Sequence, residues 1–260
     1  MTTNVIGLRQ SKELLLAWTS RIIRGRYQQS ALGWTWALIL PIAQAVIFTI
    51  IFTRFVPIDT GNVPYIVFSY VAMVPWTFLA TSLPDMSNSI VSNMTLVTKI
   101  YFPREALPLA SMLARFADFG ISAILLMVLI VLFQLPVSLT GLLFLPFILA
   151  IQLLLIIGIG LASAAANVFY RDVQSLLTLV IQLWFYASPI IYPVTSVPEP
   201  LRPFYFLNPM AGILVAYRDI LIYGSLPGAY LIPSAIVSVI IFLGGYWFFK
   251  RVEFLFADII

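Results

Sequence analysis

Six long apolar stretches limit what this chain can fold into more than any other feature of its sequence. A helix that crosses a bilayer needs about 20 mostly apolar residues, because about 30 Å of hydrocarbon is crossed at about 1.5 Å per residue. With 62% hydrophobic and 9% charged residues, the chain lacks the charge, about 25%, of a typical soluble domain. The sequence therefore predicts an all-α integral membrane protein with six transmembrane helices. We place them at Ala31 to Phe55, Ile66 to Leu83, Phe116 to Leu135, Leu139 to Ala166, Val173 to Ile191 and Tyr230 to Phe249, the second with room to continue past Pro84.

The absence of histidine and cysteine from the sequence excludes several kinds of chemistry. Imidazole bases, thiolate nucleophiles, His or Cys metal sites and disulfide bonds all need one of these side chains. The sequence also contains no G-x-x-x-x-G-K-[ST] phosphate-binding loop, so this chain is not expected to hydrolyse ATP. We expect a transport protein with no catalytic residue, no bound metal or cofactor and no nucleic-acid partner, driven by a partner protein or by a gradient.

The fourteen lysines and arginines are divided unevenly between the two sides that six spans create. An even number of spans leaves both ends of the chain on one side. All the cations fall on that side except Arg54, Arg202 and Arg218. Because cytoplasmic loops carry an excess of Lys and Arg, this asymmetry predicts that both termini are cytoplasmic.

The first 30 residues are expected to form an amphipathic helix at the cytoplasmic membrane interface, followed by one six-span domain over residues 31–260. They contain several cations and no uninterrupted apolar core, which distinguishes them from a signal peptide. An anchor on anionic lipids and a docking helix for a partner both remain open. On a helical wheel Leu8, Leu15, Trp18 and Ile22 share one stripe, and Arg9, Glu13, Ser20 and Arg24 share another.

A cytoplasmic connection from Lys99 to Pro108 mixes aromatic and charged residues. Pro103 suits the first turn of a helix and Pro108 cannot lie in the interior of the same helix, which predicts a short, stiff helix. Aromatic side chains beside charges suit a protein partner, and a loop held at the lipid headgroups is the alternative. The residues concerned are Lys99, Tyr101, Phe102, Pro103, Arg104 and Glu105.

The turn from Asn167 to Asp172 lies between the fourth and fifth predicted spans. Arg171 near the end of one helix and Asp172 at the start of the next are expected to cap the two helix ends, as helix dipoles favour. That structural role is sufficient on its own, and docking to a partner is the alternative.

On the external side, the stretch from Tyr192 to Ala229 holds six of the seventeen prolines and is long for a structureless loop. Apolar residues recur in it at helical spacing, and Pro209 after Asn208 marks a helix start. We expect one or two short re-entrant helices that pack on protein or line a cavity. The helical positions are Met210, Ile213, Leu214, Tyr217 and Leu221.

Four passages are distinctive: Arg26-Tyr-Gln-Gln-Ser-Ala-Leu-Gly-Trp34, Lys99 to Pro108, Asn167 to Asp172, and Asn208-Pro209 leading into Tyr217-Arg218-Asp219. Together, and in this order, they resemble the membrane subunit of type-2 ABC exporters for O-antigen, capsular polysaccharide or teichoic acid. The resemblance covers essentially the whole chain. It implies a homodimer around a central channel in the inner membrane of a bacterium, driven by two copies of a separate ATP-binding subunit that holds ATP and Mg²⁺. The implied cargo is a lipid-linked polysaccharide.

The same resemblance implies roles for individual segments. Tyr101 to Leu107 matches the coupling helix of the family, and the turn with Phe169, Tyr170, Arg171 and Asp172 matches a segment close to the ATPase. The insert over residues 192–229 matches the periplasmic re-entrant helices of the family, and segments of this kind often gate an exit. Its candidate gate residues are Tyr192, Asn208, Pro209, Tyr217 and Arg218.

For a sugar chain, a suitable channel lining combines aromatic faces with neutral hydrogen-bonding groups, since the rings present an apolar face to sugar C–H groups. An interfacial belt or packing against lipid explains any single aromatic residue equally well. The candidate lining residues are Trp76, Gln182, Trp184, Phe185 and Tyr186.

Two acids, Asp85 and Asp118, lie close to the predicted spans. A gradient-driven transporter uses such groups to carry protons. Asp118 follows Arg115 by three residues, so an ion pair near a helix N-terminus is the structural alternative. A secondary transporter also predicts repeated halves, and no convincing internal repeat is found. A type-2 ABC exporter of a drug or a lipid remains the closest alternative function.

Overall fold

The structure is a computed structural model that describes residues 2–28, 33–61, 63–99 and 102–257, with side chains in the first helix described from Glu13 onward. Within these residues every regular element is a helix and no strand occurs. The α-helices are α1 (Thr2–Tyr27), α2 (Trp36–Ile50), α3 (Tyr65–Ser89), α4 (Met94–Lys99), α5 (Ala106–Leu132), α6 (Leu139–Phe169), α7 (Val173–Tyr186), α8 (Arg202–Tyr205), α9 (Pro209–Leu221) and α10 (Leu231–Val252).

Five helical segments among the described residues are long and apolar enough to cross a membrane: Gly33–Phe55, Tyr65–Ser89, Ala106–Leu132, Leu139–Phe169 and Leu231–Phe256. The fifth predicted span is helical only over α7, which has 14 residues. Its helix ends before Pro189, as expected because a proline disfavours the helical conformation of the residue that precedes it. The all-α membrane fold is therefore confirmed, and a sixth full span stays a prediction.

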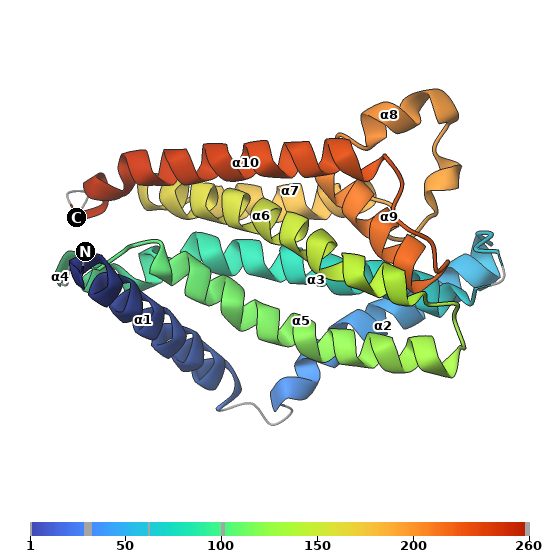
Figure 1. Cartoon of the computed structure of the whole chain (residues 1–260), viewed down its shortest axis with the longest axis horizontal. Coiled ribbons are helices and arrows are strands. Elements are labelled where there is room, and N and C mark those ends of the chain that lie inside the picture. The colour runs from blue at the N-terminus through green and yellow to red at the C-terminus, as the bar shows by residue number, and fades with distance from the viewer. Residues whose placement is uncertain (1, 29–32, 62, 100–101, 258–260) are drawn as a thin grey trace.

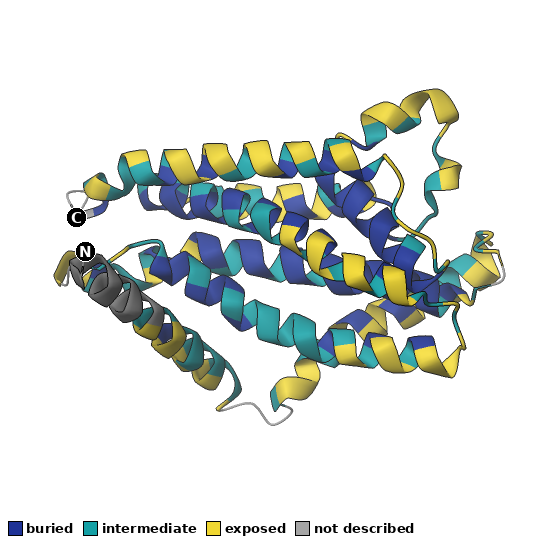
Figure 2. Ribbon diagram, viewed as in Figure 1, coloured by how far each residue is buried: buried dark blue, intermediate teal, exposed yellow. Residues whose placement is uncertain are grey.

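The long helices lie roughly side by side, and α1 begins at the same end of the molecule at which α10 ends (Figure 1). We call this the termini end, and the opposite end, which carries the α9–α10 connection, the far end. Helix α3 runs through the middle of the protein, and 78% of its most apolar stretch is buried. Figure 2 shows the same concentration of buried residues in α3 and α9. The core is thus built around α3.

Two prolines lie inside α3, and the helix continues through both to Ser89, which confirms that the second span extends past Pro84. Partners on α6 bond the backbone oxygens of α3. The amide of Gln152 donates to the Pro75 oxygen at 2.8 Å, and the amide of Asn167 donates to the Ser87 oxygen at 3.0 Å. Gln152 therefore bonds between helices, as polar side chains inside a membrane often do.

Glycines allow α6 and α10 to pack with their backbones close together. A Cβ atom at Gly158 would lie 2.6 Å from the Cα of Phe242, and one at Gly245 would collide with the carbonyl oxygen of Gly158. Small residues permit such an approach between helices in a membrane. Neither glycine was singled out from the sequence, because each is recognisable only once its partner helix is known.

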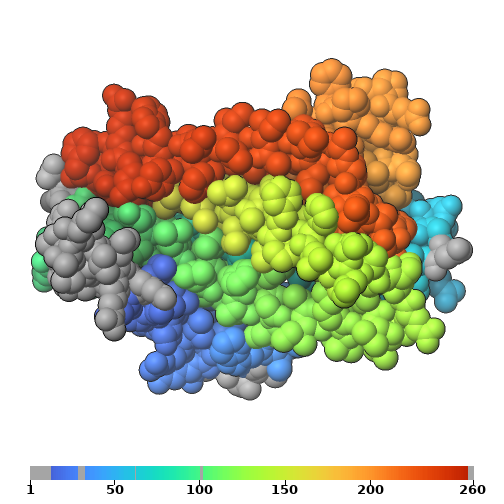
Figure 3. Space-filling model, in the orientation of Figure 1, coloured from blue at the N-terminus to red at the C-terminus, as the bar shows by residue number. Residues whose placement is uncertain are grey.

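The first helix is confirmed as a long helix, and its apolar stripe contacts protein. Trp18 is buried, and Leu15 and Ile22 pack against the same small core, which also contains Val97 and Leu107. Figure 3 shows the described part of α1 lying against the rest of the molecule. Leu8 and Arg9 of the predicted stripes lie outside the described side chains. The amphipathic pattern is therefore explained, at least in its second half, by packing within the chain.

Candidate functional site

A groove with an aromatic lining runs between α2, α3 and α7. Its volume is about 370 Å³. Four of the predicted channel residues, Trp76, Gln182, Phe185 and Tyr186, line it, although they are spread over more than a hundred positions of the sequence. The other groove residues are Gln44, Phe48 and Ile181. We call this set the aromatic groove.

Trp184, the fifth predicted lining residue, lies behind the aromatic groove. Its ring meets Trp76 edge-on with centroids 5.9 Å apart, and its Nε1 donates to the Asn208 side-chain oxygen at 2.7 Å. Phe185 also packs edge-on against Trp76 at 5.7 Å. Trp184 therefore supports the groove wall and links it to α9.

The aromatic groove is suited to a neutral, polar and elongated molecule. Its polar groups are the two amides of Gln44 and Gln182 and the hydroxyl of Tyr186, and its lining contains no charged side chain. Tyr186 is 65% exposed, so one side of the groove is open at the surface of the single chain. Rings that present flat faces, with amides that donate and accept, match the alternating C–H and O–H groups of a sugar.

The chain turns at the far side of the groove, and Arg218 of α9 holds this turn in place. Its guanidinium donates to the carbonyl oxygens of Pro189 at 2.5 Å, Ile190 at 2.7 Å and Phe68 at 3.3 Å. It also lies 3.6 Å from the centroid of the Phe68 ring. Arg218 is only 3% exposed, so its charge is buried within the protein. Converging carbonyl oxygens replace the water that such a charge requires.

Two more of the predicted gate residues, Asn208 and Tyr192, bond to the same region. The Asn208 amide donates to the Ala187 oxygen and to the Ser188 hydroxyl, both at 3.1 Å. The Tyr192 hydroxyl bonds the hydroxyl of Tyr205 at 3.0 Å. In addition, the Asn208 oxygen caps α9 by accepting from the Met210 amide, with Pro209 in the first turn, which confirms the predicted helix start.

Tyr217 points away from this turn and contacts a different helix. Its hydroxyl donates to the Gln152 side-chain oxygen at 3.1 Å. Next to it, burial raises the pKa of Asp219, and the Tyr230 hydroxyl donates to this carboxylate. The helix α9 is thus bonded on several sides, and the gate role of these residues stays a prediction.

At the termini end, the predicted short helix over residues 101–107 is wrong for the residues described. Phe102 and Pro103 lie outside any helix, a turn follows at Arg104 and Glu105, and α5 begins at Ala106. Pro108 is accommodated in the first turn of α5, where its missing N–H needs no partner. A short helix, α4, ends at the exposed Lys99 instead, and Tyr101 lies outside the described residues.

The two predicted coupling segments meet at Phe256. The Arg104 guanidinium lies 5.8 Å from the centroid of the Phe256 ring, and the Phe169 ring is 6.1 Å from it. Glu105 accepts from Lys250 at 2.8 Å, which ties the same segment to α10. The C-terminal turn, residues 253–257, was not singled out from the sequence, because only the fold brings it here.

The turn after α6 presents its side chains to the outside. Tyr170 is 72% exposed, and Arg171 and Asp172 are also exposed. Asp172 occupies the N-cap position of α7, but its side chain accepts no capping bond. The predicted capping role of Asp172 was therefore wrong, and the exposed turn is free to meet another molecule.

A family model for ABC-2 type transporters matches residues 13–222 of the chain. The chain belongs to the ABC-2 type transporter family. It is 27% identical over 248 residues to the O-antigen export system permease protein RfbA of Klebsiella pneumoniae, with 95% of each chain covered. Its identity to the protein of the same name from Myxococcus xanthus is 30% over 237 residues, with 90% of each covered. It is also similar to the polysialic acid transport protein KpsM of Escherichia coli, at 24% identity over 225 residues and 84% of each chain.

Within this ABC-2 type transporter, four charged residues form a compact cluster that joins three helices. Arg26 of α1 bonds Asp118 at 2.7 Å and Asp85 at 3.0 Å, and Arg115 bonds the same carboxylates at 3.4 and 2.6 Å. The Tyr27 hydroxyl donates to Asp118 at 2.5 Å. Burial and this carboxylate raise the pKa of Tyr27, so its hydroxyl remains a donor. We call these five residues the charge cluster.

The charge cluster partly corrects the role expected for Asp118. Its ion pair with Arg115 is confirmed. Asp118 does not lie near a helix N-terminus as expected, because α5 begins at Ala106, three turns before it. Instead, Arg26 and Tyr27 stabilise the negative charge of the Asp118 carboxylate. Both acids are paired with two arginines each, which favours a structural role over a proton relay.

Proposed function

We propose that this chain is the membrane-spanning permease subunit of an ATP-driven exporter. Its cargo is a lipid-linked polysaccharide of the O-antigen, capsule or teichoic acid type, moved from the cytoplasmic side across the inner membrane of a bacterium. The observation that carries the proposal is the uncharged aromatic groove, in a chain similar over most of its length to O-antigen export permeases and a polysialic acid transport protein.

The aromatic groove acts as one side of the sugar path. It is open on one side of the single chain, and a second copy of the permease completes it around a central channel. Aromatic faces support each sugar ring without a strong bond to any one of them, so the chain slides. The groove amides of Gln44 and Gln182 replace hydroxyl–water bonds as sugars pass.

ATP is hydrolysed by two copies of a separate ABC subunit, which holds ATP and Mg²⁺ and binds the termini end. The exposed turn with Tyr170, Arg171 and Asp172, the neighbouring segment with Phe102 to Glu105, and the exposed Lys99 form the docking surface. With both termini cytoplasmic, anionic lipid headgroups also meet the cations of this end.

Substitutions in the groove test this function. In the bacterium that carries this gene, Gln182→Ala combined with Tyr186→Ala should reduce surface polysaccharide at least about tenfold while the permease stays in the membrane. Lipid-linked polysaccharide should accumulate inside. The matched control is Leu243→Ala, a change at a similarly exposed position on α10 that lies outside the groove.

Normal surface polysaccharide after deletion of the gene would reject the polysaccharide as cargo. If the deletion strain instead became sensitive to a drug, or failed to export another lipid, the permease would belong to an exporter of that class. Equal loss of export in the control and in the groove variant would place the sugar path elsewhere in the protein.

A further inference from the structure

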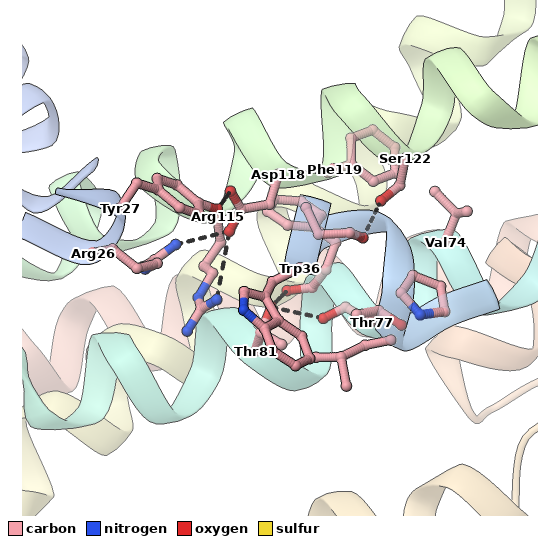
Figure 4. A pocket seen from close by; sticks show the side chains of 14 residues that line it. Arg26, Tyr27, Trp36, Val74, Thr77, Thr81, Arg115, Asp118, Phe119 and Ser122 are labelled. Atoms are coloured by element: carbon pink, nitrogen blue, oxygen red, sulfur yellow. Dashed lines mark hydrogen bonds and ion pairs between the residues drawn. The ribbon is translucent and has the colours of Figure 1, made fainter. Parts of the chain in front are cut away.

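A cavity of about 220 Å³ adjoins the charge cluster, between the end of α1, the start of α2, and the middle of α3 and α5. Figure 4 shows Arg26, Tyr27, Arg115 and Asp118 together on one side of it. The space equals that of about seven water molecules at about 30 Å³ each. It is separate from the aromatic groove, since the two share no lining residue.

The lining of this cavity changes from charged to apolar along its length. Beyond Asp118 the wall is formed by mostly apolar side chains. Ser122 and Thr81 also line the cavity, and their hydroxyls donate to backbone oxygens, that of Ala37 at 2.9 Å and that of Thr77 at 2.8 Å. A cavity that is charged at one end and apolar at the other matches an amphiphile. The apolar wall residues are Ala37, Leu40, Pro41, Val74, Phe78 and Phe119.

The cavity opens at the surface of the single chain, near the start of α2. Trp36 and Leu40 at its rim are 46% and 53% exposed. Trp34, beside them, stacks on Tyr27 with ring centroids 4.6 Å apart. Tryptophans with one side exposed mark the headgroup level of a bilayer. A lipid headgroup is therefore at the right depth to enter.

The charge cluster keeps cationic groups that can still donate hydrogen bonds and carboxylate oxygens that can still accept them. Arg26 bonds within the cluster through Nη1 and Nη2, and Arg115 through Nε and Nη1, which leaves the Nε of Arg26 and the Nη2 of Arg115 outside these ion pairs. Asp118, the carboxylate that lines the cavity, accepts from both arginines through Oδ2 and from the Tyr27 hydroxyl through Oδ1, so Oδ1 has one acceptor site left. The side chains remain between 14% and 32% exposed. Two arginines and two aspartates are together neutral.

We propose that this cavity binds a zwitterionic phospholipid with a phosphoethanolamine headgroup. The phosphate accepts from Arg26 and Arg115, the ammonium donates to Asp118, and the first methylenes of an acyl chain lie against Leu40, Pro41 and Phe119. An anionic lipid is disfavoured, because it brings a charge that the neutral cluster does not compensate and that meets two carboxylates. The bound lipid braces α1 against α3 and α5.

The headgroup preference of the purified, detergent-solubilised protein tests this site. Phosphatidylethanolamine should bind at least about tenfold more tightly than phosphatidylglycerol, as expected for one lost charged hydrogen bond. Native mass spectrometry measures the retained lipid, and thermal unfolding with added lipid measures the stabilisation. Phosphatidylcholine, whose ammonium has no N–H, should also bind more weakly. Equal binding of all three lipids would overturn the proposal.

A charge variant makes the test specific to the cavity. Asp85→Asn leaves the cluster with one net positive charge and should shift the preference toward phosphatidylglycerol. The matched control is Glu253→Gln, which changes the protein charge by the same amount beside Lys250 at the termini end. An equal shift in both variants would mean that net charge alone, and not this site, selects the lipid.

A second pair of variants keeps the outcome decisive if Asp85→Asn does not fold. Leu40→Trp fills the mouth of the cavity and should abolish the effect of phosphatidylethanolamine on unfolding. Ile47→Trp, on the same helix and similarly exposed at 55%, lies outside the lining and should leave it intact. A retained lipid effect in Leu40→Trp would place the lipid elsewhere.

Discussion

At the scale of single residues, several polar side chains of this transporter bond backbone oxygens of other segments of the chain. Arg218 and Asn208 secure the turn after α7, and Gln152 bonds α3. Some of these partners were readable from the sequence, because the Asn208 cap and the Arg115–Asp118 pair depend on near neighbours. The partners of Arg218 were not predictable from the sequence, since its acceptors on α3 and after α7 are brought to it only by the fold.

Replacement of Arg218 by lysine should destabilise the protein strongly. A lysine has one compact ammonium and cannot reach carbonyl oxygens that converge from several directions, as a planar guanidinium does. Each buried carbonyl left without a donor costs about 1 to 3 kcal/mol. Thermal unfolding in detergent should therefore begin at a clearly lower temperature for Arg218→Lys. The control Arg202→Lys, at a partly exposed arginine that bonds the Val197 oxygen, should unfold nearly as the parent does; similar losses in both would show that the burial of Arg218 does not matter.

At the scale of helices, hydropathy located the apolar segments better than their ends. The fifth helix begins ten residues before the predicted Phe116, because its first turns are buried by protein rather than by lipid. The seventh ends five residues before the predicted Ile191. Contacts such as those between α6 and α10 were not predictable, since one sequence does not say which glycine faces which helix.

Alanine at two glycines should change stability in opposite directions. At Gly158 a Cβ atom meets the backbone of α10, and overpacking of this kind costs about 1 to 3 kcal/mol. At Gly244 a Cβ atom meets nothing within 4 Å, so alanine should stabilise α10 by up to about 1 kcal/mol through its helix propensity. Unfolding temperatures in detergent that fall for Gly158→Ala and rise or hold for Gly244→Ala are the expected result. A fall of the same size in both would refute the close packing at Gly158.

At the scale of the whole molecule, composition and apolar runs were enough to predict the all-α membrane fold, and the four distinctive passages were enough to predict the family. The grouping of Trp76, Gln182, Phe185 and Tyr186 in one groove needed the structure, because they come from two helices far apart in the sequence. The cavity at the charge cluster was not predicted at all. Its charged and apolar residues come from four helices, and the sequence of no single one of these helices indicates a binding site.

Single cysteines should report the orientation of the molecule, since the chain has none of its own. Leu226→Cys lies at the far end and Phe254→Cys at the termini end, and both parent residues are exposed. With cytoplasmic termini, a membrane-impermeant maleimide should label Leu226→Cys on intact cells. It should label Phe254→Cys only after permeabilisation. The reverse pattern would invert the topology, and labelling of both positions on intact cells would contradict a membrane-spanning arrangement between them.

The length of α7 bears on the bilayer around the transporter. At about 1.5 Å per residue its 14 residues extend about 21 Å, which is short of the hydrocarbon thickness of about 30 Å. Apolar residues along it, such as Leu176, Leu179 and Leu183, are exposed. A hydrophobic mismatch of this size is relieved by thinning of the adjacent leaflets or by association with another protein surface. Membrane thickness, set by acyl-chain length, is therefore a physical variable to which transport by this protein should respond.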